Sequence, residues 1–149
     1  MSFFGTIDRR SLAVLASLML MFDLIPAHSA ASEPDIAKGQ KLYAQHCASC
    51  HGANLEGQPN WRDPLPDGRL RAPPHDETGH TWHHSDEQLF EITKRGPAAI
   101  VGGTYRSDMQ GYQGILSDSE IRAVLAYIKN SWPDRIRKRH DARNKRRDE

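Results

Sequence analysis

The sequence lacks three features: a long apolar run, a strong charge of one sign, and more than two cysteines. Its 20 Lys and Arg residues against 19 Asp and Glu residues give a net charge of +1, so no overall field attracts nucleic acid. The longest apolar stretch, Leu12 to Ile25, is shorter than the roughly 20 residues that a membrane-spanning helix needs. No alternating strand pattern and no internal repeat stand out. These absences argue against a nucleic-acid-binding protein and against a β-sheet fold.

The first residues have the features of a secretory signal peptide. Arg9 and Arg10 precede the apolar stretch, and small residues follow it as far as Ala31. We therefore expect residues 1–31 to be removed and the protein to be exported to the periplasm. An uncleaved membrane anchor is the alternative. The remaining chain is long enough for one domain, which we place at residues 32–133.

The C-terminal segment differs from the rest in charge. Residues 134–149 hold eight basic and four acidic side chains. Such runs are usually solvated ends of a chain. We predict a basic, disordered tail, with docking on an acidic partner or an anionic membrane surface as its alternative use.

Capping residues and apolar spacing predict three helices: residues 32–47, Ser85 to Gly96, and Ser117 to Trp132. Gly39 lies inside the first helix, where glycine is unfavourable, so we expect a close helix crossing there. Residues 52–84 and 96–116 are rich in Gly, Pro and polar residues and predict loops. Such long loops in a small all-α domain suggest that a large prosthetic group organises them.

The segment Cys47-Ala48-Ser49-Cys50-His51 has the C-x-x-C-H pattern of covalent haem attachment. Two sulfurs one helical turn apart can reach two vinyl groups of a porphyrin, while the adjacent imidazole turns to the iron. A disulfide over so short a span would stabilise little, and a thioredoxin-like pair belongs beside a βαβ pattern. A zinc site that adds two histidines stays open as an alternative. We predict one haem c.

The iron needs a sixth ligand opposite His51. Met109 is the only methionine after the signal peptide, and its polar, glycine-flanked segment shows no core periodicity. A histidine ligand would lower the reduction potential. The candidates are His75, His80, His83 and His84. We favour Met109. Adventitious copper or zinc binding by the clustered histidines is conceivable, but we assign them no site, and we expect His46 and His140 to face solvent.

On these residues the chain resembles the monohaem cytochrome c family of small all-α electron-transfer proteins. The resemblance covers residues 33–133 and depends on the cysteine motif, the Pro73-Pro74 pair, the Met109 loop and residues 116–121. It implies about three main helices with long loops wrapped around the haem. It also implies that the first and last helices cross, with Gly39 and Tyr43 against Val124 and Tyr127.

The resemblance further implies partners around the haem. A proline carbonyl should accept the Nδ1 hydrogen of His51, and the candidates are Pro73 and Pro74. The candidates for contact with the haem propionates are Trp82, Tyr105 and Arg106. The chain departs from many relatives by having Gln110 after Met109 and by the histidine-rich loop 76–84.

These features predict a periplasmic electron carrier, monomeric, that exchanges electrons with a donor and an acceptor protein and needs no catalytic residue. One alternative is a peroxidase-like haem enzyme, which would require an open sixth position. Another is a cytochrome subunit of a larger oxidase or dehydrogenase that uses the basic tail for association.

Overall fold

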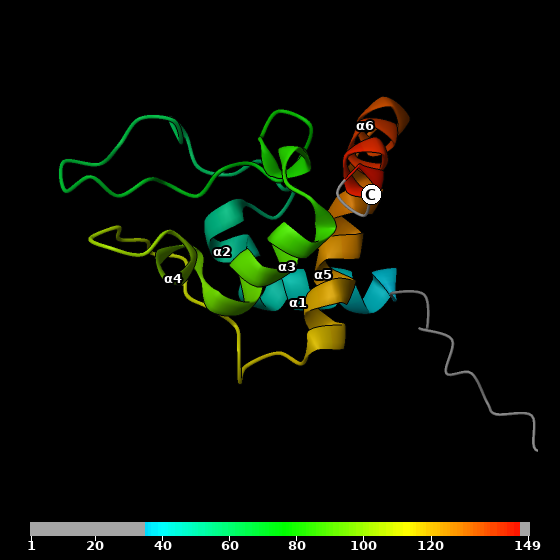
Figure 1. The fold of residues 1–149 in the computed structure, drawn as a ribbon, viewed down its shortest axis with the longest axis horizontal. Coiled ribbons are helices and arrows are strands. Elements are labelled where there is room, and N and C mark those ends of the chain that lie inside the picture. Colours follow the sequence, from blue (N-terminus) through cyan, green and yellow to red (C-terminus); the bar gives the residue numbers. More distant parts are fainter. Residues whose placement is uncertain (1–34, 147–149) are drawn as a thin grey trace, which may run out of the picture. The chain divides into compact units, whose positions relative to one another are not determined.

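The computed structural model describes residues 35–146, which form helices and loops without a strand (Figure 1). The helices are α1 (Ile36–His46), α2 (Ala48–His51), the 3-10 helix η1 (Thr81–His83), α3 (Asp86–Arg95), α4 (Pro97–Val101), α5 (Asp118–Ser131) and α6 (Asp134–Lys145). The all-α prediction is confirmed. Within this range no helix combines the length and the apolar character needed to cross a membrane. The expected signal peptide lies outside the described residues.

Helices α1 and α5 cross where Gly39 is buried. A Cβ atom at Gly39 would lie 2.0 Å from the carbonyl oxygen of Ala123 and 3.1 Å from the Cβ of Tyr127. Only glycine lets the two backbones approach this closely. Tyr43 packs beside the crossing, with its ring centroid 5.5 Å from that of Tyr127. The predicted crossing is present, although its closest atom belongs to Ala123 and not to Val124.

The helix ends follow local capping chemistry with two differences from the prediction. The N-terminal cap of α1 is Asp35 and not the predicted Ser32, and the side chain of Asp35 accepts a hydrogen bond from the Lys38 backbone at 2.9 Å. The expected loop 96–116 contains the short helix α4, because Pro97 suits a first helical turn. The capping box of Ser117 and Glu120 at the start of α5 is present as predicted.

Two clusters of buried apolar side chains form the core. The first contains Tyr43, Leu55, Val124, Ile128, Trp132 and Ile136, with Cys47 and Trp82 packed against it. The second contains Phe90, Tyr112, Leu116 and Ile121, with Met109 packed against it. The cysteine motif and the methionine loop therefore lie on different clusters.

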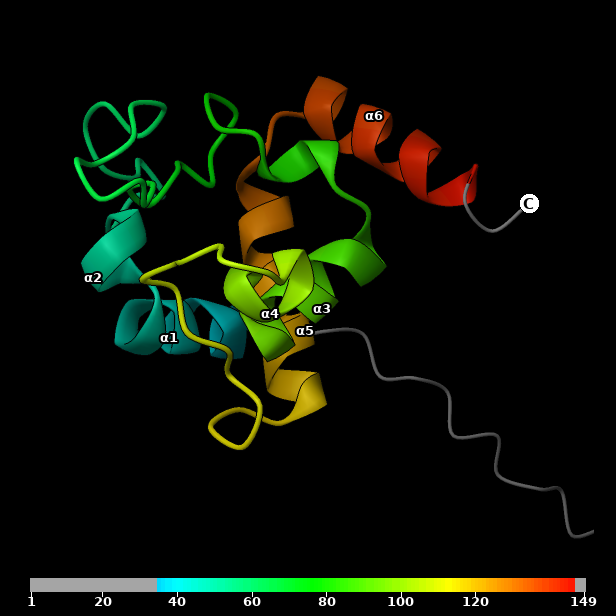
Figure 2. The ribbon, with the colours of Figure 1, turned by 60° about the vertical axis from the view of Figure 1, so that its left-hand side comes forward.

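Residues 134–145 form helix α6, so the prediction of a disordered tail is wrong over this range (Figure 2). Ile136 and His140 are one helical turn apart on the buried side of α6, and the side chain of His140 is fully buried. The ring centroid of His140 lies 5.0 Å from that of Trp132. The expectation that His140 faces solvent is therefore also wrong.

Polar contacts of Asp86 join α6 to the start of α3 and to the end of α5. The carboxylate of Asp86 accepts from Asn144 Nδ2 at 2.6 Å and from Lys129 Nζ at 3.3 Å. Lys129 also pairs with Asp141 at 2.8 Å, and His140 Nε2 lies 3.6 Å from Asp86. Burial lowers the pKa of His140, so its ring is neutral at neutral pH. These contacts fix α6 against α3 and α5.

Candidate haem site

The cysteine motif lies where α1 passes into the single-turn helix α2. The backbone N–H groups of Cys50 and His51 both donate to the carbonyl of Cys47, at 3.1 and 2.9 Å. This turn places the two cysteines one helical turn apart, and both thiols are free. Cys47 is partly buried and Cys50 is exposed. The pair therefore has the spacing and the free sulfurs that attachment to a porphyrin edge requires.

His51 is 7% exposed and is held by its backbone surroundings. Its Nδ1 lies 2.9 Å from the carbonyl oxygen of Pro73. Because a carbonyl only accepts, Nδ1 carries the proton and Nε2 is the nitrogen left to bind a metal. Among residues 35–146, the hydrogen bond of the His51 ring is the one made by Nδ1. Burial lowers the pKa of His51, which keeps the ring in the neutral form that a metal binds.

The loop that carries Pro73 is anchored to the end of α2. The Gly57 N–H donates to the His51 carbonyl at 2.7 Å, and Gln58 N–H donates to the Ala72 carbonyl at 2.9 Å. Gly57 has a φ of 68°, and a Cβ atom there would lie 2.6 Å from the carbonyl carbon of Pro73. Of the two predicted prolines, it is Pro73 whose carbonyl meets His51.

A second imidazole, that of His75, stacks on His51. The two ring centroids are 4.0 Å apart and the rings are inclined by 20°. His75 Nδ1 also contacts Thr81 Oγ1 at 2.8 Å, and burial lowers the pKa of His75 well below its ordinary value. A ligand opposite His51 would not lie face to face with it, so this geometry does not suit His75 as the sixth ligand. The sequence indicated His75 only as a ligand candidate and did not predict this stacking.

Met109 is partly buried and packs against the second core cluster. Three residues later, the hydroxyl of Tyr112 donates to the carbonyl of His46 at 2.6 Å, beside Cys47. Burial raises the pKa of Tyr112, and the nearby Cys47 and Cys50 raise it further. The methionine loop thus contacts the start of the C-x-x-C-H segment through Tyr112.

Surface contacts tie the methionine loop to the loop that precedes Pro73. Arg106 Nη2 donates to the Asp67 carbonyl at 2.7 Å. Arg69 pairs with Asp67 at 2.7 Å and also with Asp108, next to Met109. Two of the residues proposed to meet the propionates, Tyr105 and Arg106, therefore lie in a loop that contacts residues 67–69.

The histidine-rich loop is arranged by aromatic contacts. The rings of His80 and Trp61 are stacked, with their centroids 5.3 Å apart. The ring centroids of Trp82 and His83 are 3.8 Å apart, and Trp82 Nε1 donates to the Glu77 carbonyl. Across residues 35–146, no group of three or more His, Cys, Asp or Glu side chains is placed to hold a metal ion. Burial raises the pKa of Cys47 to about 11, whereas redox-active cysteines have lowered values. Neither the zinc nor the thioredoxin alternative is supported.

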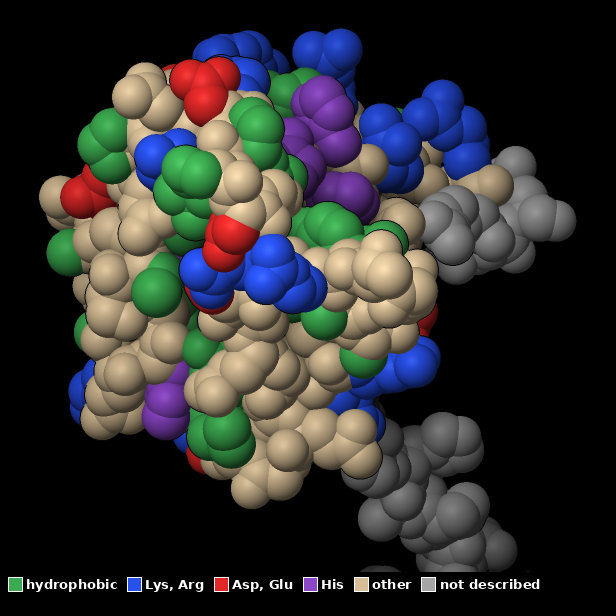
Figure 3. Space-filling view, turned by 90° about the vertical axis from the view of Figure 1, so that its left-hand side faces the viewer, with side chains coloured by type: hydrophobic (Ala, Val, Ile, Leu, Met, Phe, Trp, Pro, Cys, Tyr) green, Lys and Arg blue, Asp and Glu red, His purple; other side chains and the backbone are tan. Residues whose placement is uncertain are grey.

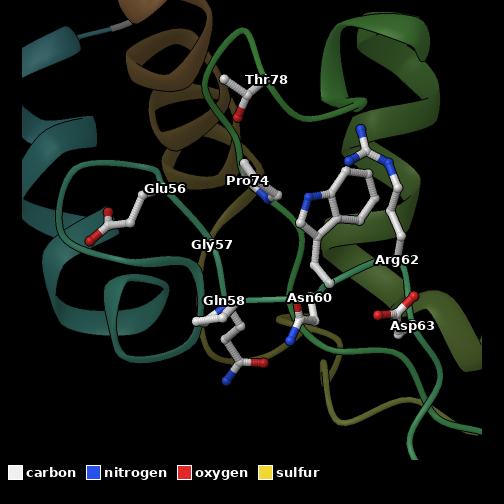
Figure 4. A pocket seen from close by; sticks show the side chains of 10 residues that line it. Glu56, Gly57, Gln58, Asn60, Arg62, Asp63, Pro74 and Thr78 are labelled. Atoms are coloured by element: carbon white, nitrogen blue, oxygen red, sulfur yellow. The ribbon is translucent and has the colours of Figure 1, made fainter.

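A cavity of about 590 Å³ lies beside the loop that carries Pro73, called the proline loop below (Figure 4). Residues 56–63, Pro74 and Thr78 line it, and the lining includes the charged residues Glu56, Arg62 and Asp63. Neither the cysteines nor Met109 line this cavity. It therefore backs onto the segment that carries Pro73 and is separate from the predicted haem ligands.

The described groups fit a covalently attached haem. They supply two free thiols one helical turn apart, an oriented imidazole with an unpartnered nitrogen, and a thioether on a loop that contacts the same segment. These are the donor types of c-type haem attachment with His and Met ligation.

Comparisons with known proteins agree with this chemistry. The family model described as Cytochrome c matches residues 36–132. The chain is also similar to the Cbb3-type cytochrome c oxidase subunit FixP of Bradyrhizobium sp. (strain ORS 278), with 30% identity over 96 residues. The aligned part is 63% of this chain and 27% of that relative. No solved structure matches the chain.

Proposed function

The chain belongs to the cytochrome c family, whose members transfer electrons through haem, and on that premise we propose an exported, monomeric electron carrier with one haem c. The observation that carries the proposal is the hydrogen bond from His51 Nδ1 to the Pro73 carbonyl. It orients a buried imidazole directly after two free cysteines, and it leaves Nε2 available for iron.

Each named residue has a distinct role in this proposal. Cys47 and Cys50 would attach the porphyrin through their sulfurs, and His51 and Met109 would hold the iron. A bound haem c supplies one-electron redox chemistry. The Pro73 carbonyl fixes the ring plane of His51 and makes it a stronger donor. A thioether opposite a histidine raises the reduction potential, which suits a carrier that accepts electrons readily.

A subunit of a larger complex is the second candidate, favoured by the similarity to an oxidase subunit. The chain covers 27% of that relative, so the relative's assembly is a proposal for this chain and not a finding. A peroxidase-like enzyme is a weaker candidate. It would need an open sixth position on the iron, whereas Met109 packs against the second core cluster, in a loop that contacts the residue before the cysteine motif.

Expression in bacteria that mature c-type cytochromes tests the proposal. We expect haem that survives acid-acetone extraction, a periplasmic location after fractionation, and a weak far-red band of sulfur-ligated ferric iron. The double variant C47A/C50A should lose covalent haem, whereas the control variant S49A should keep it. Absence of covalent haem in the unmodified chain would overturn the proposal.

Two further measurements separate the candidates. An iron closed by Met109 should resist carbon monoxide, so ready binding of carbon monoxide would favour the enzyme. Size-exclusion chromatography of a periplasmic extract should show the haem signal at the mass of a single chain. Elution of that signal only in a much larger particle would favour the complex subunit.

A further inference from the structure

A cavity of about 330 Å³ lies where helix α6 packs against the histidine-rich loop. It is lined by Trp82, Arg139, Ala142, Arg143 and Arg146. Figure 3 shows Lys and Arg side chains gathered beside a group of histidines on one face of the molecule. Three arginines and one aromatic side chain thus line the same cavity, which concentrates positive charge there.

Among residues 35–146, these arginines have no counter-charge, unlike Arg135 and Arg137 of the same helix. Arg135 pairs with Glu77 and Arg137 pairs with Asp134. Within residues 35–146, no carboxylate lies within 4.0 Å of the guanidinium groups that line the cavity. In addition, the Nε of Arg143 is buried and has no hydrogen-bond partner there. A buried donor without an acceptor is costly, and a bound anion would satisfy it.

The chemistry of the cavity suits a carboxylate. Planar guanidinium groups bind carboxylates through paired, charge-assisted hydrogen bonds. The guanidinium of Arg139 lies 5.4 Å from the ring centroid of Trp82, so this arginine is positioned by the indole. Trp82 itself packs on the first core cluster. The cavity therefore has an apolar wall, formed by Trp82, and a guanidinium that is positioned on this wall.

Helix α6 is a fixed platform for this cavity. Ile136 and His140 are buried beneath it, and Asn144 donates to Asp86 at the start of α3. The arginines therefore lie on a folded surface and not on a loose tail. Binding here would not have to order a flexible segment first.

From these observations we infer that the arginine cavity of α6 binds a carboxylate side chain of an acidic partner protein. A membrane surface is less suitable, because an interfacial helix needs an exposed apolar face. Within the described chain, the large hydrophobic side chains that are exposed all lie outside α6. Identifying the partner as a redox protein rests on the proposed function, whereas carboxylate binding can be measured independently.

A series of residue contacts links Trp82, in the wall of the cavity, to the candidate haem site. Trp82 follows Thr81, whose hydroxyl contacts His75, and His75 stacks on His51. A partner that binds at the cavity would therefore lie on the His51 side of the site and not on the Met109 side.

Isothermal titration with a capped hexaglutamate peptide at low ionic strength tests the inference on the full exported protein. The variant R139Q/R143Q should weaken binding about tenfold, because it removes two charge-assisted donor groups. The control K138Q/K145Q removes the same charge from exposed positions of the same helix that have no ion pair in the described structure, and it should weaken binding by less than about threefold. Circular dichroism and the haem spectrum verify that each variant is folded.

Three other outcomes would overturn the inference. Equal weakening by the two variants would mean that diffuse charge, and not the cavity, binds the peptide. Sedimentation of the protein with phosphatidylglycerol vesicles, together with no binding of hexaglutamate, would identify a lipid surface instead. The variant R139K/R143K keeps the charge but loses the planar donors, so full retention of affinity would also contradict the proposed geometry. None of these binding results depends on which residues bind the haem iron. The absorption spectrum tests the iron ligands separately, so a failure of this inference can be told from a failure of the proposed function.

Discussion

The His51 side and the Met109 side of the candidate site are held by different kinds of contact. His51 is 7% exposed, and a backbone carbonyl fixes its ring. The loop that supplies this carbonyl is itself bonded to α2 through Gly57. Met109, in contrast, follows Asp108, which forms an ion pair with Arg69. The side chains of Asp108 and Arg69 are 56% and 35% exposed.

Buried backbone hydrogen bonds are hard to replace, whereas exposed ion pairs contribute little and compete with water. We therefore expect the His51 side to stay intact under conditions in which the Met109 side opens. The difference also suits electron transfer, because a fixed imidazole keeps its orientation while the sixth ligand sets the potential.

The largest effect should come from Met109→Ala. The far-red band of sulfur-ligated ferric iron should disappear, and the reduction potential should fall by roughly a tenth of a volt or more, within the roughly 0.8 V that axial ligands span. Covalent haem should remain, because Cys47 and Cys50 are untouched. Absorption spectra and a redox titration measure both quantities. A variant that keeps the band would show that Met109 is not the ligand.

A smaller effect is expected on the His51 side from Gly57→Ala. The new Cβ would meet the carbonyl carbon of Pro73 at 2.6 Å, at a φ of 68° that favours glycine. Gly68→Ala is the matched control, because Gly68 has a φ of 84° and open space around it. Overpacking should lower the free energy of unfolding by about 2 kcal/mol more than in the control.

Denaturant titration of the two holoproteins measures this difference, and a redox titration shows whether the His51 hydrogen bond has changed. A weaker hydrogen bond should raise the potential of the Gly57 variant. Equal stability and equal potential in both variants would mean that the proline loop is not held against His51 as described.

Tyr112→Phe tests the link between the two sides. The variant loses the 2.6 Å hydrogen bond to the His46 carbonyl, and the free energy of unfolding should fall by about 1 kcal/mol. The control Tyr127→Phe keeps the ring that packs against Tyr43 and removes a hydroxyl that has no hydrogen bond among residues 35–146. Thermal melts followed by far-UV circular dichroism compare the two. A control that is as damaging as the test variant would contradict the role of this bond.

The sequence predicted the parts of the site that depend on local patterns. Adjacent residues define the cysteine motif, and the caps of α3 and α5 follow from Ser85 and Ser117. The crossing at Gly39 was predictable because glycine is unfavourable inside a helix unless a second backbone must approach it closely. The pairing of His51 with a proline carbonyl came from the family resemblance, and the structure selects Pro73.

Contacts between distant segments were not predictable in this way. Helix α6 was missed because its composition is that of a solvated chain, and only Ile136 and His140 form its buried side. The buried position of His140 involves contacts with Trp132 and Asp86, which come from other elements. The stacking of His75 on His51 likewise requires the fold of a loop that contains no regular structure before η1.

Arg69→Gln should produce the smallest effect, and it tests the ion pairs that link the methionine loop to residues 67–69. The variant loses the pair with Asp108 next to Met109, while the surface exposure of both groups leaves the melting temperature close to that of the wild type. The loop should nevertheless open more often, so cyanide should bind the ferric protein a few-fold faster in stopped-flow measurements. Arg62→Gln removes another exposed arginine, one that lies over Trp61, and should leave the cyanide rate unchanged. A rate that is unchanged in Arg69→Gln, or raised equally in both variants, would show that the surface ion pair does not restrain the methionine loop. The two sides of the site would then differ in burial but not in mobility.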